Sequence, residues 1–365
     1  MTQYPAARYC LAGLGLLIAA CSASPPPAVL EPVPEPPAEV APAEPPAPLA
    51  VEVAEAWVSE ARPEEGIAAL AVWPGGGDRA WVIAAAAATD RLLVLDAGTG
   101  EILTEHGATG EIAGRFRRPA GLAVVADLLL VAEAEGGRVQ ALRLPGLSTA
   151  GFLGAGTLRA PGVLAAVAAG SGYEVWIGDD GEEDGRGEIV HLLFTLDGDS
   201  LRGEVGAPVA AARTGGDTLA QLAALVADPA RGRLLVAERM SGGGLWVLDA
   251  DGRFAGRAAE GLAGDPPGLA LFPCGEEGGW WIVAEPGDSD DATRFRLLDR
   301  ITLEPAGSFT APATAGSSAV AASAAATPEL PAGAVYALGH EGTVTAFDWS
   351  DIASALDLPD CERRS

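Results

Sequence analysis

Two acidic, glycine-rich segments hold the residues of this sequence that are best suited to chemistry. Residues 178–185 read GDDGEEDG and directly follow a run of β-forming residues, and residues 287–291 read GDSDD. Alternating carboxylates on a pliable loop suit a hard cation such as Ca²⁺, so Asp179 and Asp180 are candidate metal ligands. The alternative is a solvated hairpin turn, because Gly and Asp are common turn residues and neither segment has the full spacing of an EF-hand.

The basic and imidazole side chains offer fewer candidates. Arg115, Arg117 and Arg118 form one basic cluster. It could meet an anion, with Arg118 as the candidate phosphate ligand, or it could form salt bridges to an acidic surface. The three histidines, which lack the spacing of metal ligands, are His106, His191 and His340. The sequence shows no Ser-His-Asp pattern, nucleotide-binding loop or cysteine-rich metal motif.

The charge balance is strongly acidic. There are 50 Asp and Glu residues against 23 basic residues, all of them Arg, and the net charge is −27. Nucleic-acid binding is excluded as a general function, because phosphate backbones require clustered cations. Apolar residues make up 49% of the chain, enough to bury a sizeable core and unlike a disordered protein.

The first twenty residues have the composition of an export signal. Arg8 is their only charged residue, and residues 11–20 are apolar but too few for a permanent membrane span. Residues 17–21 read LIAAC and resemble the bacterial lipobox, which predicts cleavage and lipidation at Cys21. The alternative is an ordinary secretory signal followed by a chance cysteine. Ser22 is not an acidic retention residue, which favours the periplasmic face of a Gram-negative outer membrane.

A proline-rich tether follows the signal. Residues 21–50 are dominated by Pro, Ala and Glu and have no apolar periodicity. Such a segment favours polyproline II at about 3 Å per residue, a reach of up to roughly 90 Å. The predicted organisation is a signal over 1–20, a tether over 21–50 and one folded domain over 51–361.

Two cysteines remain in the folded domain. Cys274 and Cys361 are an even pair in an exported chain, which predicts one disulfide. Two separate buried thiols are the alternative. The disulfide requires the two Cα atoms to come within about 7 Å.

A unit of about 40–60 residues recurs six times. Each unit begins with a short strand of small and apolar residues, at 67–72, 120–124, 162–167, 222–226, 268–272 and 319–322. A second β-rich run follows each of these, at 81–83, 128–131, 175–177, 234–236, 280–283 and 335–337. A third and a fourth run complete each unit. The pattern predicts an all-β fold, a six-bladed β-propeller with four antiparallel strands per blade.

The propeller pattern also assigns places to particular segments. The first strand of each unit lines a central channel, where small residues fit the crowded axis. Residues 51–58 complete the last blade, because a closed ring removes exposed sheet edges. A β-sandwich is the alternative fold, and the six similar units favour the propeller.

Two family resemblances agree with this fold. Residues 118–124 (RPAGLAV), 131–133 (VAE) and 137–140 (GRVQ) resemble one NHL propeller repeat. Residues 221–238 and 347–353 (FDWSDIA) carry a broader resemblance, over about residues 64–358, to the bacterial β-propeller phytases. That resemblance implies a calcium-dependent phosphatase acting on inositol hexakisphosphate.

The chain departs from the phytase family at its chemical positions. The family's DDPAIW reads AALAVW at 68–73, and its DGID reads SAVA at 318–321. What survives is Glu238, the first Glu of an Ala-Glu-Glu motif, and Asp265, the Asp of an Asp-Val-Glu-Gly step. With Asp179 and Asp180, these are the candidate calcium ligands. Calcium needs six to eight oxygen ligands, so the losses argue against turnover.

The sequence therefore predicts a phytase-like propeller lipoprotein that is catalytically degenerate and serves as a periplasmic binding or scaffold module. It is expected to be a monomer, held by outer-membrane lipid through Cys21, with no nucleic-acid partner and with calcium as its candidate cofactor. The alternative is a working calcium-dependent phosphohydrolase of the 3-phytase class. A weaker alternative is a protein-interaction propeller of the NHL type.

Overall fold

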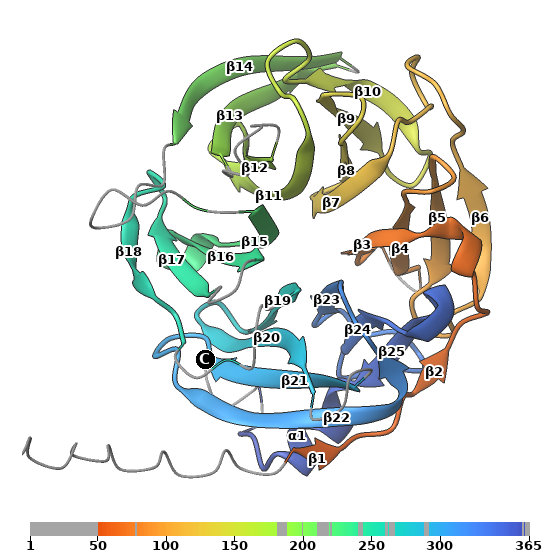
Figure 1. The fold of residues 1–365 in the computed structure, drawn as a ribbon, viewed down its shortest axis with the longest axis vertical. Helices are drawn as coiled ribbons and strands as arrows, with labels where there is room; N and C mark the ends of the chain where they lie inside the picture. Colours follow the sequence, from red (N-terminus) through yellow and green to blue (C-terminus); the bar gives the residue numbers. More distant parts are fainter. Residues whose placement is uncertain are drawn as a thin grey trace, which may run out of the picture. The chain divides into compact units, whose positions relative to one another are not determined.

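The folded domain is a closed ring of six β-sheets. A computed structural model describes residues 50–76, 79–180, 188–198, 200–209, 219, 221–239, 244–259, 262, 267–287, 292–359 and 361. Each sheet is one blade, and the first strands of neighbouring blades lie side by side around the centre (Figure 1). The predicted six-bladed propeller of antiparallel blades is confirmed.

Blades one to three are each built from four consecutive strands. In chain order these are β3 (Ile67–Trp73), β4 (Trp81–Ala86), β5 (Arg91–Asp96) and β6 (Ile102–His106); β7 (Pro119–Val125), β8 (Leu128–Glu133), β9 (Arg138–Arg143) and β10 (Ser148–Leu153); β11 (Pro161–Ala169), β12 (Gly172–Asp179), β13 (Glu188–Asp197) and β14 (Ser200–Val209).

Blades four to six follow the same order, and the chain ends in a short helix. The elements are β15 (Gln221–Asp228), β16 (Arg233–Arg239), β17 (Leu245–Asp249) and β18 (Phe254–Arg257); β19 (Gly268–Cys274), β20 (Gly278–Pro286), β21 (Ala292–Asp299) and β22 (Pro305–Ala315); β23 (Val320–Ser323), β24 (Ala334–Leu338), β25 (Val344–Asp348) and α1 (Trp349–Ala355). The described part of the chain contains no helix long and apolar enough to cross a bilayer.

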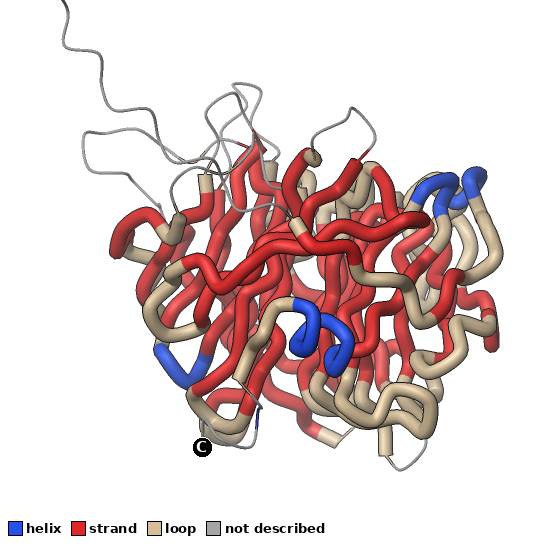
Figure 2. The backbone as a smooth tube through the Cα atoms, turned by 90° about the horizontal axis from the view of Figure 1, so that it is seen from below, coloured by secondary structure: helices blue, strands red, loops and turns tan. Residues whose placement is uncertain are grey.

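The strands run between the two faces of the ring, and the turns gather at those faces (Figure 2). The inner strands β3, β7, β11, β15, β19 and β23 surround the centre (Figure 1). Each overlaps the short apolar run predicted for it. Their Ala, Gly, Val and Leu residues suit this place because six strands converge there and large side chains would collide.

The N-terminal segment joins two blades, where the sequence predicted one. Residues 57–58 form β2 (Trp57–Val58), which pairs with β25 and completes blade six as expected. Residues 51–52 instead form β1 (Val51–Glu52), which pairs in parallel with β22 at the edge of blade five. Val53 is buried in the core shared by blades five and six, and its N–H donates to the carbonyl of Thr310 at 2.9 Å. The segment therefore crosses the edge of blade five before it closes the ring.

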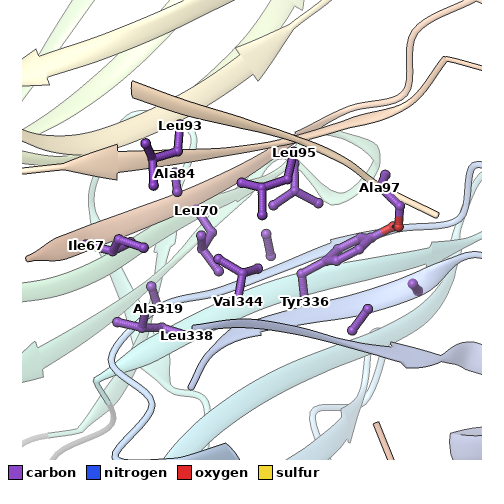
Figure 3. Packing of buried hydrophobic residues seen from close by; sticks show 14 of the residues in the cluster. Ile67, Leu70, Ala84, Leu93, Leu95, Ala97, Ala319, Tyr336, Leu338 and Val344 are labelled. Carbon is purple, nitrogen blue, oxygen red and sulfur yellow. The ribbon is translucent and has the colours of Figure 1, made fainter. Parts of the chain in front are cut away.

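The ring closes through an apolar interface between blades six and one. Leu70, Leu93 and Leu95 of blade one face Leu338 and Val344 of blade six (Figure 3).

Two donors lock the same junction. The hydroxyl of Tyr336 and Nε1 of Trp57 each donate a hydrogen bond to the carbonyl oxygen of Ala97, both at 3.2 Å. Burial raises the pKa of the Tyr336 phenol. The hydroxyl therefore remains protonated, and a hydrogen-bond donor, throughout the pH range in which the protein folds.

The C-terminal segment is fixed to blade five. Cys274, at the end of β19, forms a disulfide with Cys361; their Cα atoms are 5.0 Å apart and 87 positions separate them. The geometric requirement predicted for this pair is met. The Trp349 ring of α1 stacks on Phe272 with ring centroids 3.8 Å apart. In the chain-entropy account, a disulfide that closes a loop this long raises the free energy of unfolding by about 4–5 kcal/mol.

Candidate functional site

A buried carboxylate recurs at one end of four neighbouring blades. Each lies at or next to the end of the second strand: Glu133 in β8, Asp179 in β12, Glu238 in β16 and Glu285 in β20. In blades two to four it is paired across the sheet with the start of the inner strand, at Pro119, Pro161 and Leu222. This end of the blade receives the linker from the preceding blade.

In blade two the carboxylate fastens that linker. Glu133 accepts hydrogen bonds from the backbone N–H of Arg117 at 3.0 Å and from Nε of Arg138 at 2.9 Å. The amide of Gln140, also fully buried, donates to the same carboxylate at 3.2 Å. A buried charge is tolerated when it is paired and hydrogen-bonded in this way.

Blades one and five use the same pairing of a carboxylate with an arginine. In blade five, Nε of Arg296 donates to Glu285 at 2.7 Å. In blade one the second strand ends in Ala86, and the linker supplies the carboxylate, Glu65, which pairs with Arg91. Burial raises the pKa of Glu65, but the hydrogen bonds from Arg91 and Thr89 outweigh it and hold the pKa below its usual value.

Blade three has a carboxylate at this position but no arginine opposite it. Asp179 accepts from the backbone N–H of Arg159 at 2.8 Å and from that of Ala160 at 2.6 Å, one to each oxygen. The residue paired with it on the third strand is Glu188, where blade two has Arg138. Both oxygens of this predicted metal ligand are therefore engaged in closing the blade.

In blade four an indole N–H donates a hydrogen bond to the buried carboxylate. Nε1 of Trp246 donates to Glu238, the second predicted ligand. Arg239 follows directly and is exposed. The buried carboxylates of blades three and four thus both accept from neutral N–H donors, of the backbone in blade three and of an indole in blade four.

Asp180 is the exception among these acids, because it serves the junction between two blades. Its Oδ1 accepts from the N–H of Leu222, at the start of the inner strand of blade four, at 3.3 Å. Burial raises the pKa of Asp180, and the charge of Asp179 beside it adds to the rise, while Arg239 opposes it. The hydrogen bond from Leu222 also opposes the rise, so the raised pKa follows mainly from burial at the junction between the two blades.

The other predicted site residues are not brought together. Asp265 and Cys21 lie outside the described residues. Arg118 directly precedes the first strand of blade two; its backbone N–H donates to Asp90 of blade one at 2.6 Å, and its guanidinium has no ion-pair partner among the described residues. Within the described ranges, no three His, Cys, Asp or Glu side chains come close enough together to hold a metal ion.

Sequence reasoning missed the role of Glu133, Gln140 and Glu285. The signal was present as a recurrent Val-Ala-Glu at 131–133, 236–238 and 283–285. The first copy also belongs to the NHL-like repeat, and of the three acids only Glu238 has a predicted chemical role, as a metal ligand. A repeated acid that follows a buried strand in several blades indicates a structural role that the blades share.

No family model matches the sequence, and no curated protein matches it. Solved structures resemble the fold at low identity. The nidogen–laminin complex shares 15% identity with a TM-score of 0.48, over 72% of this chain and 87% of that chain. Hydrazine synthase of Kuenenia stuttgartiensis shares 13% identity with a TM-score of 0.44, over 79% of this chain and 97% of that chain. The Dos1 propeller shares 12% identity with a TM-score of 0.45, over 85% of this chain and 73% of that chain. At these identities the similarities concern the fold and carry nothing about function.

Proposed function

We propose that this protein is a lipid-anchored periplasmic propeller, related to the β-propeller phytases, that acts by binding or scaffolding and not by hydrolysis. The observation that carries the proposal is the use of the blade-end carboxylates. Asp179 and Glu238, the described acids best placed to be ligands, accept hydrogen bonds from their own blades. Each oxygen that accepts such a hydrogen bond has one lone pair fewer to offer a cation, and the bond fixes its direction toward the blade.

Calcium-dependent phosphatase chemistry requires more oxygens than the described acids at this end of the blades bring together. Each Ca²⁺ takes six to eight oxygen ligands, and hydrolysis at such a centre needs water activated by the metal. Ala68 and Ala69 stand where the phytase family has two carboxylates. The charge of −27 would also repel inositol hexakisphosphate unless metal ions bridged the two.

The hydrolase alternative has one observation in its favour. Asp179 and Asp180 of blade three and Glu238 of blade four lie at the same end of adjacent blades, and Leu222 links them through its N–H to Asp180 and its pairing with Glu238. These three carboxylates would be the first ligands of a cation site between the two blades.

Phosphate release decides between the two functions. The purified full chain is incubated with inositol hexakisphosphate, with and without millimolar calcium, and inorganic phosphate is measured. The proposal predicts no calcium-dependent release. Release that requires calcium, and that Asp180→Asn abolishes while Asp251→Asn at an exposed turn does not, would establish the hydrolase instead.

A further inference from the structure

The linker between blades one and two forms a shaped loop, residues 107–118, that presents an apolar side chain to solvent. Ile112 is 68% exposed, more than any other large apolar side chain among the described residues. Phe116, four residues on, is completely buried and packs with the core shared by blades one and two. The loop is therefore rooted in the domain at one point and apolar at its tip.

The loop is held in place from beneath by polar groups of blade two. The buried Gln140 accepts from the N–H of Gly114 at 2.7 Å and donates to the carbonyl of Arg115 at 3.0 Å. Arg138 donates to the carbonyl of Glu111 at 2.6 Å, on the other side of the tip. Backbone on both sides of Ile112 is thus fixed. A fixed loop loses little conformational entropy when its tip is buried by a partner.

The charge around the tip differs from that of the molecule as a whole. Arg117 is paired with Glu111 and Glu135, at 3.2 and 3.7 Å. Arg115 and Arg118 are exposed, and within the described ranges neither forms an ion pair. In a chain of net charge −27, the loop that carries the exposed isoleucine thus also carries two exposed arginines, while the acidic Glu111 next to Ile112 is paired with Arg117.

We propose that loop 107–118 is a docking element for a protein partner that offers an apolar pocket bordered by carboxylates. The pocket would take Ile112, and the carboxylates would meet Arg115 and Arg118. Interface energy concentrates in a few side chains that are well packed at the centre, and the complementary charge selects the partner and speeds its approach. This inference rests on the proposed binding function and names its surface.

Two other occupants fit the surface less well. An anionic membrane would attract the two arginines, but the net charge of −27 opposes its approach. A second copy of this chain carries the same acidic charge and is repelled likewise. Both become outcomes of the test.

A stability measurement establishes first that Ile112 serves no structural purpose. Ile112→Asp should leave the melting temperature unchanged, because its side chain is already in water. Gln140→Ala should lower the melting temperature, since it leaves a buried N–H and carbonyl without partners. A drop with Ile112→Asp comparable to that of Gln140→Ala would mean that the isoleucine stabilises the fold, and it would overturn the proposal.

Site-specific photo-crosslinking then tests the docking itself. A benzophenone amino acid is placed at position 112 of the full chain in intact cells, with position 301 as the control. Ile301 is 44% exposed and lies in the turn between β21 and β22 of blade five. The proposal predicts one discrete adduct with another protein from position 112, none from position 301, and a loss of at least about tenfold in yield with Arg118→Glu.

Four other results would overturn the proposed docking role of the loop. They are the absence of an adduct at position 112, an adduct at position 301 in similar yield, a cross-linked dimer of this chain, and delipidated protein that sediments with vesicles of anionic lipid. An adduct at 301 alone moves binding to another surface and leaves the proposed function standing. Calcium-dependent phosphate release overturns the proposed function whatever the cross-linking shows.

Discussion

At the scale of single residues, two adjacent aspartates do opposite things to stability. Asp179 places each oxygen against a backbone N–H, and its charge is well matched by these dipoles. Asp180 has one such N–H, from Leu222, and burial raises its pKa. The neighbouring carboxylate adds to the rise. The difference follows from the number of donors that the surrounding chain supplies to each.

Substitution of the two aspartates should therefore change stability in opposite directions. Asp180→Asn should stabilise the protein at neutral pH, because a group whose folded pKa is raised loses its contribution as pH rises through that pKa. The gain should shrink as pH falls toward about 4, where the wild-type carboxyl is protonated as well.

Asp179→Asn is the matched control. Its amide can accept from only one of the two N–H groups, which should cost about 1–3 kcal/mol. Urea unfolding of both variants at a series of pH values measures the effects. A stabilising Asp179→Asn, or an Asp180→Asn that destabilises at pH 7, would contradict this account.

His106 gives the domain a second dependence on pH. Its ring contacts Phe116 edge-on at 6.2 Å between centroids, and its Nε2 is buried without a hydrogen-bond partner among the described residues. Burial lowers the pKa of His106 below its usual value. A depressed pKa means that stability is present above the unfolded pKa, about 6.5, and is lost as pH falls through the folded pKa.

Replacement of His106 should remove this part of the pH dependence. The loss of stability between about pH 7 and pH 5 should be smaller in His106→Phe than in the wild type. His340→Gln is the control, because that side chain is 71% exposed. Urea unfolding gives the free energy of unfolding of the wild type and of His106→Phe as a function of pH. Parallel curves for the two proteins would show that the pKa of His106 is the same in the folded and unfolded states.

At the scale of the blade, one ion-pair cluster joins blades four and five. Asp228, at the end of β15, accepts from Nη2 of Arg300 at 2.6 Å and from Nε of Arg233 at 3.3 Å. Arg300 also donates to the carbonyl of Gly278 at 2.8 Å. Asp228 and Arg300 are both buried. Burial lowers the pKa of Arg233, and the positive charges of Arg231 and Arg300 add to the lowering, while Asp228 opposes it.

Removal of one partner should be costly here. Arg300→Ala leaves the buried charge of Asp228 underpaired and should reduce the free energy of unfolding by about 3–5 kcal/mol. The exposed pair of Arg253 and Asp251 is the control. Arg253→Ala should change the free energy of unfolding by less than about 1 kcal/mol. Equal effects of the two substitutions in denaturant unfolding would refute the assigned role of the cluster.

Elements with a local pattern were predictable, and elements fixed by distant partners were not. The inner strands could be located because a short run of small apolar residues recurs in each unit, and β19 begins at Gly268 as expected. The division of 51–58 between two blades could not be seen, because it depends on the edge of β22, some 250 positions away. The sequence placed Asp179 at the end of a strand, but it could not show that the N–H groups of Arg159 and Ala160 face it.

At the scale of the whole molecule, the two ends of the domain are fastened near each other in the ring. The N-terminal strands lie on blades five and six, and the C-terminal segment is linked to blade five by the Cys274–Cys361 disulfide. The described chain therefore begins, at residue 50, on a well-fastened part of the ring.

The anchor itself is tested at Cys21. Cys21→Ser should release the protein from the membrane fraction or block its processing, because the lipidated cysteine is the predicted N-terminus of the mature chain. Cell fractionation and the mass of the mature protein measure both effects. A variant that matures normally and still sediments with membranes would show that the lipobox assignment is wrong.

The claim that the blade-end carboxylates fasten the ends of their blades and do not bind a cation is tested most directly by calcium calorimetry on the full chain. A site with micromolar affinity would stabilise the fold by about 4 kcal/mol at a free calcium concentration about a thousand times the Kd, and a change of this size is easily seen in a melting curve. The account predicts no saturable heat in the micromolar range and little change in the melting temperature. A saturable micromolar titration that Glu238→Gln abolishes would contradict it.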